Sequence, residues 1–166
     1  MNKKMLMIIA TCLTLIIIAT GCGSSEKKNA SAVDQDVNHV QAVDSNNIDV
    51  DITEKMYVSY INDIYLNTDD YLGKGIRIEG MFKALTDENT GNTYYYVYRT
   101  GPGCCGNDGA MCGFEFTWDD TMPKDNDWIE VIGPLRAYEE DGWDYLTLDA
   151  VSVTIMEARG AETVYQ

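Results

Sequence analysis

Alternating apolar and polar residues in the second half of the chain constrain the fold more than any other feature. Ile76, Ile78, Gly80 and Phe82 take one side of a predicted strand, and charged residues separate the first three. A period of two residues is typical of β-strands that bury one face. The glycine allows a long strand to bend, as a small barrel requires. We therefore expect this face, Phe82 included, to lie in a hydrophobic core.

Four further segments continue this β pattern, and polar turns separate them. Together with the first they give five predicted strands, over residues 76–83, 94–99, 114–118, 128–138 and 145–156. Pro134 has no backbone N–H to donate, so it places part of the fourth strand at an edge or a bulge.

The last of these strands changes the parity of its inward residues once. Leu146 and Leu148 take one side, and Val151, Val153 and Ile155 then continue the inward set with the opposite parity. Such a shift predicts a bulge near position 149 or 150, with both sets facing the core.

The segment before these strands predicts a strand and a helix. Ile48, Val50 and Ile52 alternate with aspartates, and residues 60–67 carry apolar side chains at helical spacing. The whole pattern predicts a small five-stranded OB-like Greek-key barrel with one short N-terminal helix, over residues 48–158. A β-sandwich is the alternative. A stretch of this length is enough for one hydrophobic core.

The first 21 residues predict a signal peptide. Lys3 and Lys4 precede an apolar run that is short for a membrane-spanning helix. The small residues before Cys22 resemble the lipobox of bacterial lipoproteins, in which the signal is removed and the cysteine is lipidated. This resemblance implies a bacterial lipoprotein on the outer face of the cytoplasmic membrane, anchored through Cys22. A conventional signal peptide and an uncleaved anchor are the alternatives.

Two segments are expected to flank the folded domain. Residues 22–47 are polar, lack a sustained hydrophobic period and predict a flexible tether. His39, the one histidine of the sequence, lies in this tether and is not expected to bind a metal. Residues 159–166 are expected to form a C-terminal tail.

Acidic residues outnumber basic ones by 27 to 12, which gives a net charge of −15 at pH 7. A surface of this kind repels phosphate groups, so nucleic acid is not expected as a partner. The same surface attracts cations.

Residues 101–113 combine five glycines with three cysteines, between two predicted strands. Cys104, Cys105 and Cys112 together with Asp108 offer three sulfur ligands and one oxygen ligand. This set suits tetrahedral zinc, because thiolates favour zinc or copper(I) over calcium or magnesium. The neighbouring glycines allow the backbone to turn between the adjacent cysteines.

Two other interpretations of these cysteines stay open. A disulfide from Cys112 to Cys104 or Cys105 would close the loop, and a reactive thiol would serve redox chemistry. Redox chemistry needs a lowered thiol pKa, which an acidic environment opposes. The sequence contains no Ser–His–Asp set and no phosphate-binding glycine loop, so we do not expect an enzyme.

Three stretches resemble an uncharacterised bacterial family: Tyr71–Gly80, Gly103–Asp108 and Asp127–Gly133. The resemblance spans about residues 56–158. It implies an OB-like extracytoplasmic domain with a Cys-Cys-x-x-Asp motif, often found beside membrane permeases and suspected of handling metal. Cys112 is not part of that pattern. We expect a lipid-anchored, zinc-binding accessory domain that is the partner of a permease. A protein-interaction module with a disulfide-closed loop is the alternative.

Overall fold

The computed structural model describes residues 47–102 and 109–165. The predicted signal peptide, Cys22, nearly all of the predicted tether, Cys104, Cys105 and Asp108 lie outside these residues. The described elements are, in order, β1 (Val50–Ile52), the 3-10 helix η1 (Glu54–Met56), α1 (Tyr57–Leu66), the 3-10 helix η2 (Thr68–Asp70), β2 (Gly75–Thr86), β3 (Thr93–Gly101), β4 (Ala110–Thr117), β5 (Trp128–Glu140), β6 (Trp143–Asp149) and β7 (Ser152–Ile155).

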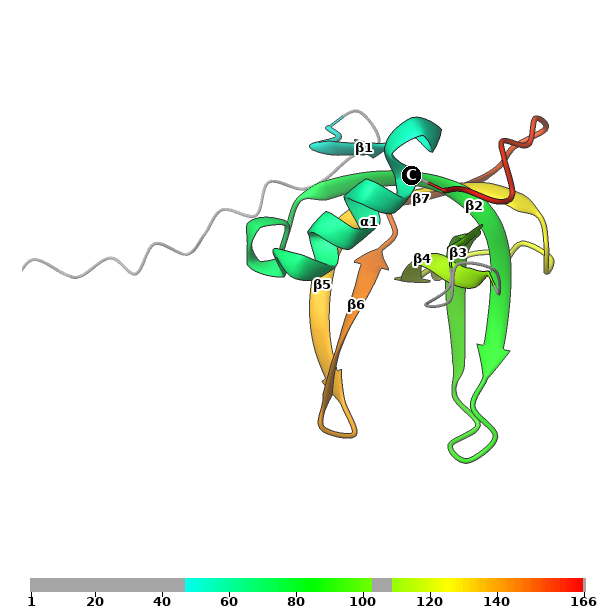
Figure 1. The fold of residues 1–166 in the computed structure, drawn as a ribbon. Coiled ribbons are helices and arrows are strands. Elements are labelled where there is room, and N and C mark those ends of the chain that lie inside the picture. The colour runs from blue at the N-terminus through cyan, green and yellow to red at the C-terminus, as the bar shows by residue number, and fades with distance from the viewer. Residues whose placement is uncertain (1–46, 103–108, 166) are drawn as a thin grey trace, which may run out of the picture. The chain divides into compact units, whose positions relative to one another are not determined.

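The strands form one mixed sheet in the order β1-β2-β3-β4-β6-β5-β7. Because β5 also pairs with β2, the strands β2, β3, β4, β6 and β5 close into a ring (Figure 1). The β1–β2 and β4–β6 pairs are parallel, and the other pairs are antiparallel. The mainly β prediction is confirmed. The described sheet has seven strands, because the strand predicted from Ile48, Val50 and Ile52 joins it as β1 and the fifth predicted strand is divided into β6 and β7. Two short strands, β1 and β7, flank the ring.

The core lies inside this ring and confirms the predicted inward face of β2. Ile76 and Ile78 are fully buried, and Phe82 is 2% exposed. The ring of Phe82 lies 6.1 Å from those of Tyr95 on β3 and Phe116 on β4. Alternating inward residues of neighbouring strands therefore meet in one hydrophobic cluster.

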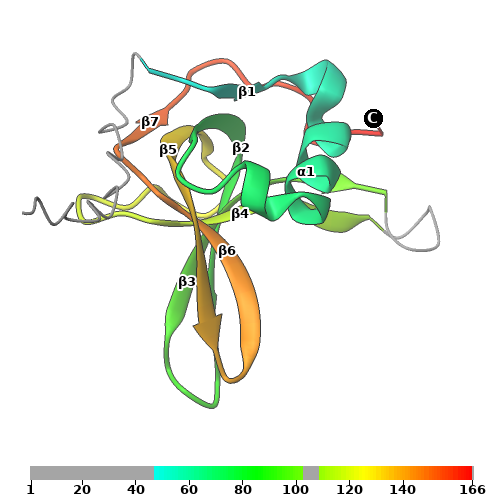
Figure 2. The same cartoon turned by 90° about the vertical axis from the view of Figure 1, so that its left-hand side faces the viewer.

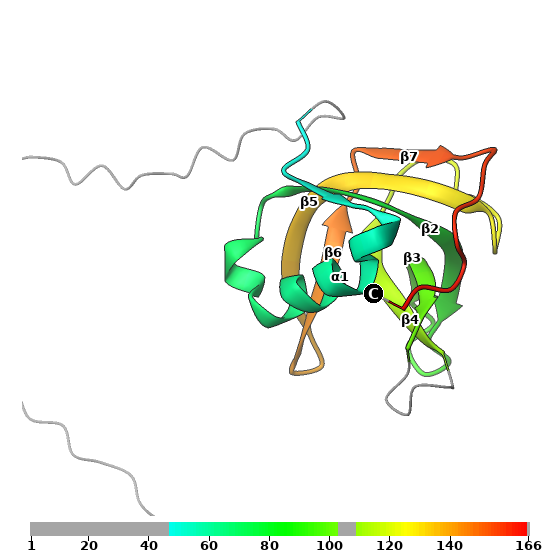
Figure 3. The same cartoon turned by 45° about the horizontal axis from the view of Figure 1, so that its top comes forward.

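Helix α1 packs against the ring through one apolar face (Figure 3). Tyr57, Ile61 and Ile64 lie on this face at helical spacing and are buried. The helix begins three residues earlier than predicted, because Tyr57 extends the same buried face by one turn. The following 3-10 turn has no side-chain cap, and Thr68 Oγ1 instead donates to the carbonyl of Ile64 at 3.0 Å.

The predicted bulge divides the last strand in two. Leu135 of β5 pairs with Leu148 of β6, whereas Ile132 of β5 pairs with Ser152 of β7. The segment from β6 to β7 therefore contains one residue more than the stretch of β5 that it faces, which is a bulge. Gly133 permits this arrangement, because a Cβ there would lie 2.5 Å from the carbonyl oxygen of Asp149. The division explains how β5 can pair with two different strands along one side.

The inward assignment of the last segment is wrong for Val151 and Ile155, which are 43% and 61% exposed. Val153, the third residue of that set, is half-buried and packs against the core cluster. β7 pairs with β5 alone and lies outside the ring, so the core covers it only in part. Pro134 lies where β5 stops pairing with β2, and Leu135 then pairs with β6. The sequence predicts Pro134 at an edge or a bulge, and the proline lies within β5 opposite the bulge, between Ile132 and Leu135.

The segment expected as a C-terminal tail packs against β3. The N–H of Thr100 donates to Glu162 and that of Val164 donates to Thr100, at 2.8 and 2.9 Å. Val164 is 4% exposed and belongs to the core cluster. The final residues, red in Figure 1, therefore contribute to the fold. In the described part of the chain, no helix is long and apolar enough to cross a membrane.

Candidate functional site

Cys112 lies near the closed end of the β3–β4 hairpin, where the cysteine-rich connection joins the two strands. Arg99 is its partner in register, and Gly101 pairs with Ala110 just beyond. Cys112 shares the parity of Phe114 and is half-buried against the core. A Cβ at Gly101 would lie 2.9 Å from the Cβ of Cys112, so glycine at this position leaves room for the thiol side chain.

Two tyrosines of α1 lie close enough to Cys112 for the charge of its thiolate to change their pKa values. Burial, and then the charge of a Cys112 thiolate, raises the pKa of Tyr65 to about 12 and raises that of Tyr57 further. The ring of Tyr65 stacks on Phe114 at 5.6 Å. Tyr57 is fully buried, and its hydroxyl makes no hydrogen bond within the described residues. A polar atom without a partner thus lies near the thiol.

Burial raises the pKa of the Cys112 thiol above its usual value. The side chain is therefore a neutral thiol at neutral pH unless a cation replaces its proton. This direction agrees with the expectation that the thiol is not activated for redox chemistry, although the cause is burial rather than the acidic surface.

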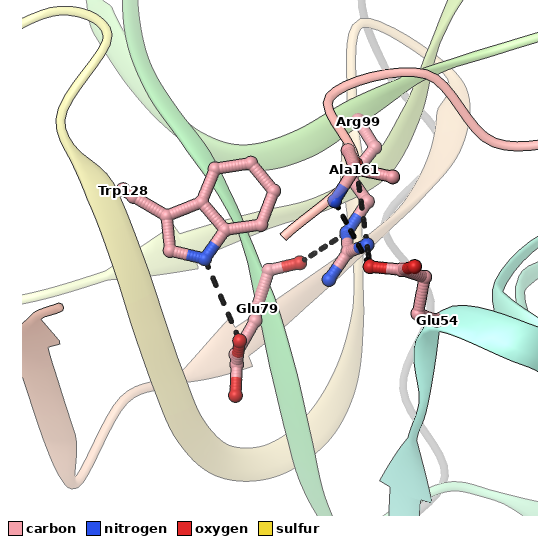
Figure 4. Close-up of polar contacts among 5 residues, drawn as sticks. All are labelled: Glu54, Glu79, Arg99, Trp128 and Ala161. Atoms are coloured by element: carbon pink, nitrogen blue, oxygen red, sulfur yellow. Dashed lines mark hydrogen bonds and ion pairs between the residues drawn. The ribbon is translucent and has the colours of Figure 1, made fainter. Parts of the chain in front are cut away.

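Arg99, the partner of Cys112 in register, is held inside the protein by fixed acceptors, which Figure 4 shows. Its side chain is 3% exposed. Nε donates to the carbonyl of Glu79 at 3.0 Å, and Nη1 donates to Glu54 Oε2 at 3.0 Å and to the carbonyl of Ala161 at 3.2 Å. Each N–H···O contact satisfies a buried charge with a fixed acceptor, as a buried cation requires.

Aromatic rings enclose the same guanidinium. Its central carbon lies 4.8 Å from the ring centroids of both Tyr57 and Trp128. Glu54 also accepts a hydrogen bond from the N–H of Ala161, and this bond, followed by Arg99, lowers the pKa of its carboxyl. Arg99 therefore joins η1, β2, β5 and the C-terminal segment at the end of β3.

A family model described as the DUF1980 C-terminal domain matches residues 27–165. This chain belongs to that family. The resemblance to an uncharacterised family noted in the sequence is confirmed at this level. The permease association and the lipobox stay predictions. No curated protein matches the sequence.

In this DUF1980 domain, one of the four predicted metal ligands lies among the described residues. Cys112 is placed as above, and Cys104, Cys105 and Asp108 belong to the connection outside them. Within residues 47–102 and 109–165, no group of three or more Cys, His, Asp or Glu side chains is arranged to hold a metal. The zinc assignment therefore stays a prediction.

Sequence reasoning missed two residues of this site, Tyr57 and Arg99. Tyr57 lies three residues before the helix predicted over residues 60–67. Arg99 has the same parity as Val97 in β3, so the alternation itself placed a charged residue on the inward face. An arginine at an inward strand position indicates a buried cation with fixed partners, and that signal was present in the sequence.

Proposed function

We propose that this domain binds a metal ion, with zinc favoured, through Cys104, Cys105, Cys112 and Asp108. The observation that carries the proposal is the position of Cys112. It is half-buried near the closed end of the β3–β4 hairpin, next to the connection that contains the other three ligands. Because Gly101 and Ala110 are paired, the connection leaves and re-enters the sheet at one point. Cys112 lies two residues inside that point, so its thiol is close to both ends of the connection.

The surroundings of Cys112 suit a metal-bound thiolate better than a free thiol. Burial opposes ionisation of the thiol, and zinc supplies the positive charge that makes the thiolate stable. Tyr57 lies near enough for the charge of a Cys112 thiolate to raise the pKa of its hydroxyl, so this thiolate is felt inside the core and a cation would offset its charge. The net charge of −15 favours capture of a cation.

The proposal also concerns the fold and the location of the domain. The closed order β2-β3-β4-β6-β5, with β4 and β6 parallel, supports a small OB-like Greek-key barrel. The lipobox-like sequence before Cys22 supports a lipid anchor on the outer face of the cytoplasmic membrane. In this setting the domain would serve as a metal-binding accessory domain and as the partner of a permease.

Zinc affinity, measured by competition with a chromophoric chelator, tests the site. Cys104→Ala, Cys105→Ala and Cys112→Ala should each weaken binding by at least about tenfold, because water replaces a thiolate poorly. Asp108→Ala should weaken it less, because water can replace one oxygen ligand. Asp119→Ala, a change in an exposed turn, is the matched control and should keep wild-type affinity.

Thiol counting on the metal-free, unreduced and denatured protein separates this proposal from the disulfide-closed interaction module. Reactivity of Cys104, Cys105 and Cys112 supports the metal site. One reactive thiol among them, together with wild-type zinc affinity in both Cys104→Ala and Cys105→Ala, refutes it.

A further inference from the structure

A cleft lies on the outer face of the ring, between two β-hairpins. The β2–β3 hairpin and the β5–β6 hairpin extend to the same side of the molecule (Figures 1 and 2). The cleft has a volume of about 360 Å³, within the range of small-molecule sites. Tyr94 and Tyr96 of β3, Tyr138 of β5 and Tyr145 of β6 line it. These tyrosines point outward because their strand neighbours take the inward positions.

Carboxylates are as numerous as tyrosines in the lining, which Leu85 and Thr86 complete. Glu115 of β4 joins the tyrosines, and Asp87, Glu140 and Asp141 come from the two hairpins near their turns. No lysine, arginine or histidine is among the residues that line the cleft. The combination of aromatic side chains with one sign of charge is therefore a property of the whole cleft.

The nearest basic side chains on the same face are already paired with other acids. Lys83 pairs with Tyr96 in register, and its Nζ lies 2.6 Å from Asp125. Arg136 forms two contacts with Asp149, at 2.7 and 2.8 Å. Neither Asp125 nor Asp149 lines the cleft, and the carboxylates of the cleft form no ion pair in the described structure. The guanidinium of Arg136 lies at the border of the cleft, 5.7 Å from the ring centroid of Tyr138.

The hydrogen bonds inside the cleft hold its side chains in place. The hydroxyl of Tyr138 donates to Glu115 Oε2 at 2.7 Å, and that of Tyr94 donates to Glu140 at 2.8 Å. The rings of Tyr138 and Tyr145 stack at 5.5 Å. An arrangement that is ordered before a ligand arrives reduces the entropic cost of binding.

A buried threonine lies behind Glu115 on the neighbouring strand. Thr147 is the partner of Glu115 in the β4–β6 register and is fully buried. It is not among the residues that line the cleft, and its hydroxyl lowers the pKa of the Glu115 carboxyl, against the larger effect of burial. Thr147 therefore favours the charged form of Glu115 without contacting a ligand in the cleft.

We propose that this cleft binds a small organic cation, with an alkylammonium or alkylguanidinium group against Glu115 and its apolar part among the tyrosines. Tyrosine rings attract such cations, and the unpaired carboxylates add Coulombic attraction. The cleft lies beside the first residues of β3, on the outer face of the sheet. Cys112 pairs with Arg99 near the last residues of β3, and its side chain faces the core. The two sites are therefore separate, and this proposal does not rest on the metal site.

The test compares butylguanidinium with butylurea, a neutral molecule of nearly the same shape. The full-length protein, kept soluble in a non-ionic detergent, is titrated with each and followed by calorimetry and by amide shifts in NMR spectra. Butylguanidinium should bind at least about tenfold more tightly than butylurea, with the largest shifts at Tyr96, Glu115 and Tyr145. A calcium titration shows whether any cation suffices, and calcium should not displace butylguanidinium.

Variants complete the test. Glu115→Gln should weaken butylguanidinium binding by about tenfold, and Tyr145→Leu should weaken it by a smaller factor. Glu157→Gln, an exposed change outside the cleft, should leave the affinity unchanged. Equal binding of butylurea, displacement by calcium, shifts that lie elsewhere, or full affinity in both folded cleft variants would each overturn the proposal.

Discussion

Arg99 and Cys112 lie opposite each other near the closed end of the β3–β4 hairpin, and both side chains face the core. The guanidinium is fixed by acceptors from three other segments of the chain. The position of Cys112 is consequently determined by contacts far from the cysteine-rich connection. A substitution of Arg99 should therefore alter the position of Cys112 and, through it, the proposed metal site.

Replacement of Arg99 by methionine should destabilise the domain by about 2 to 4 kcal/mol, because the carbonyls of Glu79 and Ala161 lose their donor. The midpoint of urea unfolding measures this effect. Lys124→Met, a change at an exposed lysine, is the control and should stay within about 0.5 kcal/mol of the wild type. A similarly small effect at Arg99 would contradict the structural role assigned to it.

Removal of residues 160–166 should destabilise the domain by at least about 3 kcal/mol. The deletion exposes the core position of Val164 and breaks both backbone hydrogen bonds to Thr100. Thermal unfolding of the truncated protein measures the loss. Removal of residues 165–166 alone is the control, since Tyr165 is 77% exposed. Equal stability of the two truncations would refute the packing of this segment.

Gly133→Ala should cost about 1 to 3 kcal/mol, because the added methyl group meets the carbonyl of Asp149 across the bulge. Chemical denaturation measures the change. Ala137→Ser, at an exposed position of the same strand, should have an effect below about 0.5 kcal/mol. A tolerated Gly133→Ala would mean that β5 and the bulge are more widely separated than described.

Glu115 should make stability depend on pH. Burial raises the pKa of this carboxyl, so the folded protein binds its proton more tightly than the unfolded chain. The resulting stabilisation is complete below the ordinary glutamate pKa of about 4.3 and is lost as pH rises through the folded pKa. Glu115→Gln should therefore gain stability relative to the wild type between pH 4 and pH 7.

Urea unfolding of the two proteins at several pH values measures this difference. Glu157→Gln is the control, because that carboxylate is exposed and lies outside the cleft. A difference between Glu115→Gln and the wild type that does not change with pH would show that the carboxyl is not penalised by its surroundings.

Local alternation predicted the strands, the inward position of Phe82 and the bulge after Leu148, because these features depend on neighbouring residues. The place of β7 depended on a pairing partner far along the chain, so Val151 and Ile155 gave no signal of their exposure. Val164 is a single apolar residue in a polar segment, and only its contact with Thr100 explains its burial.

The candidate site was predictable to a smaller extent. Cys112 shares the parity of Phe114, which is enough to place its side chain towards the core. The burial of Arg99 required acceptors from η1, β2 and the C-terminal segment, and no local pattern brings these together. The cleft required the two hairpins to extend side by side, which is a property of the ring.

Closure of the ring also limits how this domain can associate with copies of itself. Every ring strand has a partner on each side over part of its length, but β4 and β6 pair through three residues of each strand, Glu115–Thr117 with Thr147–Asp149. Addition of a strand from another chain needs an exposed edge with unpaired N–H and C=O groups. In the described sheet such edges include the rest of β4, on the side away from β3, and the rest of β6, on the side away from β5, besides the short strands β1 and β7. Closure of the ring therefore shortens the edges that are open to strand addition without removing them.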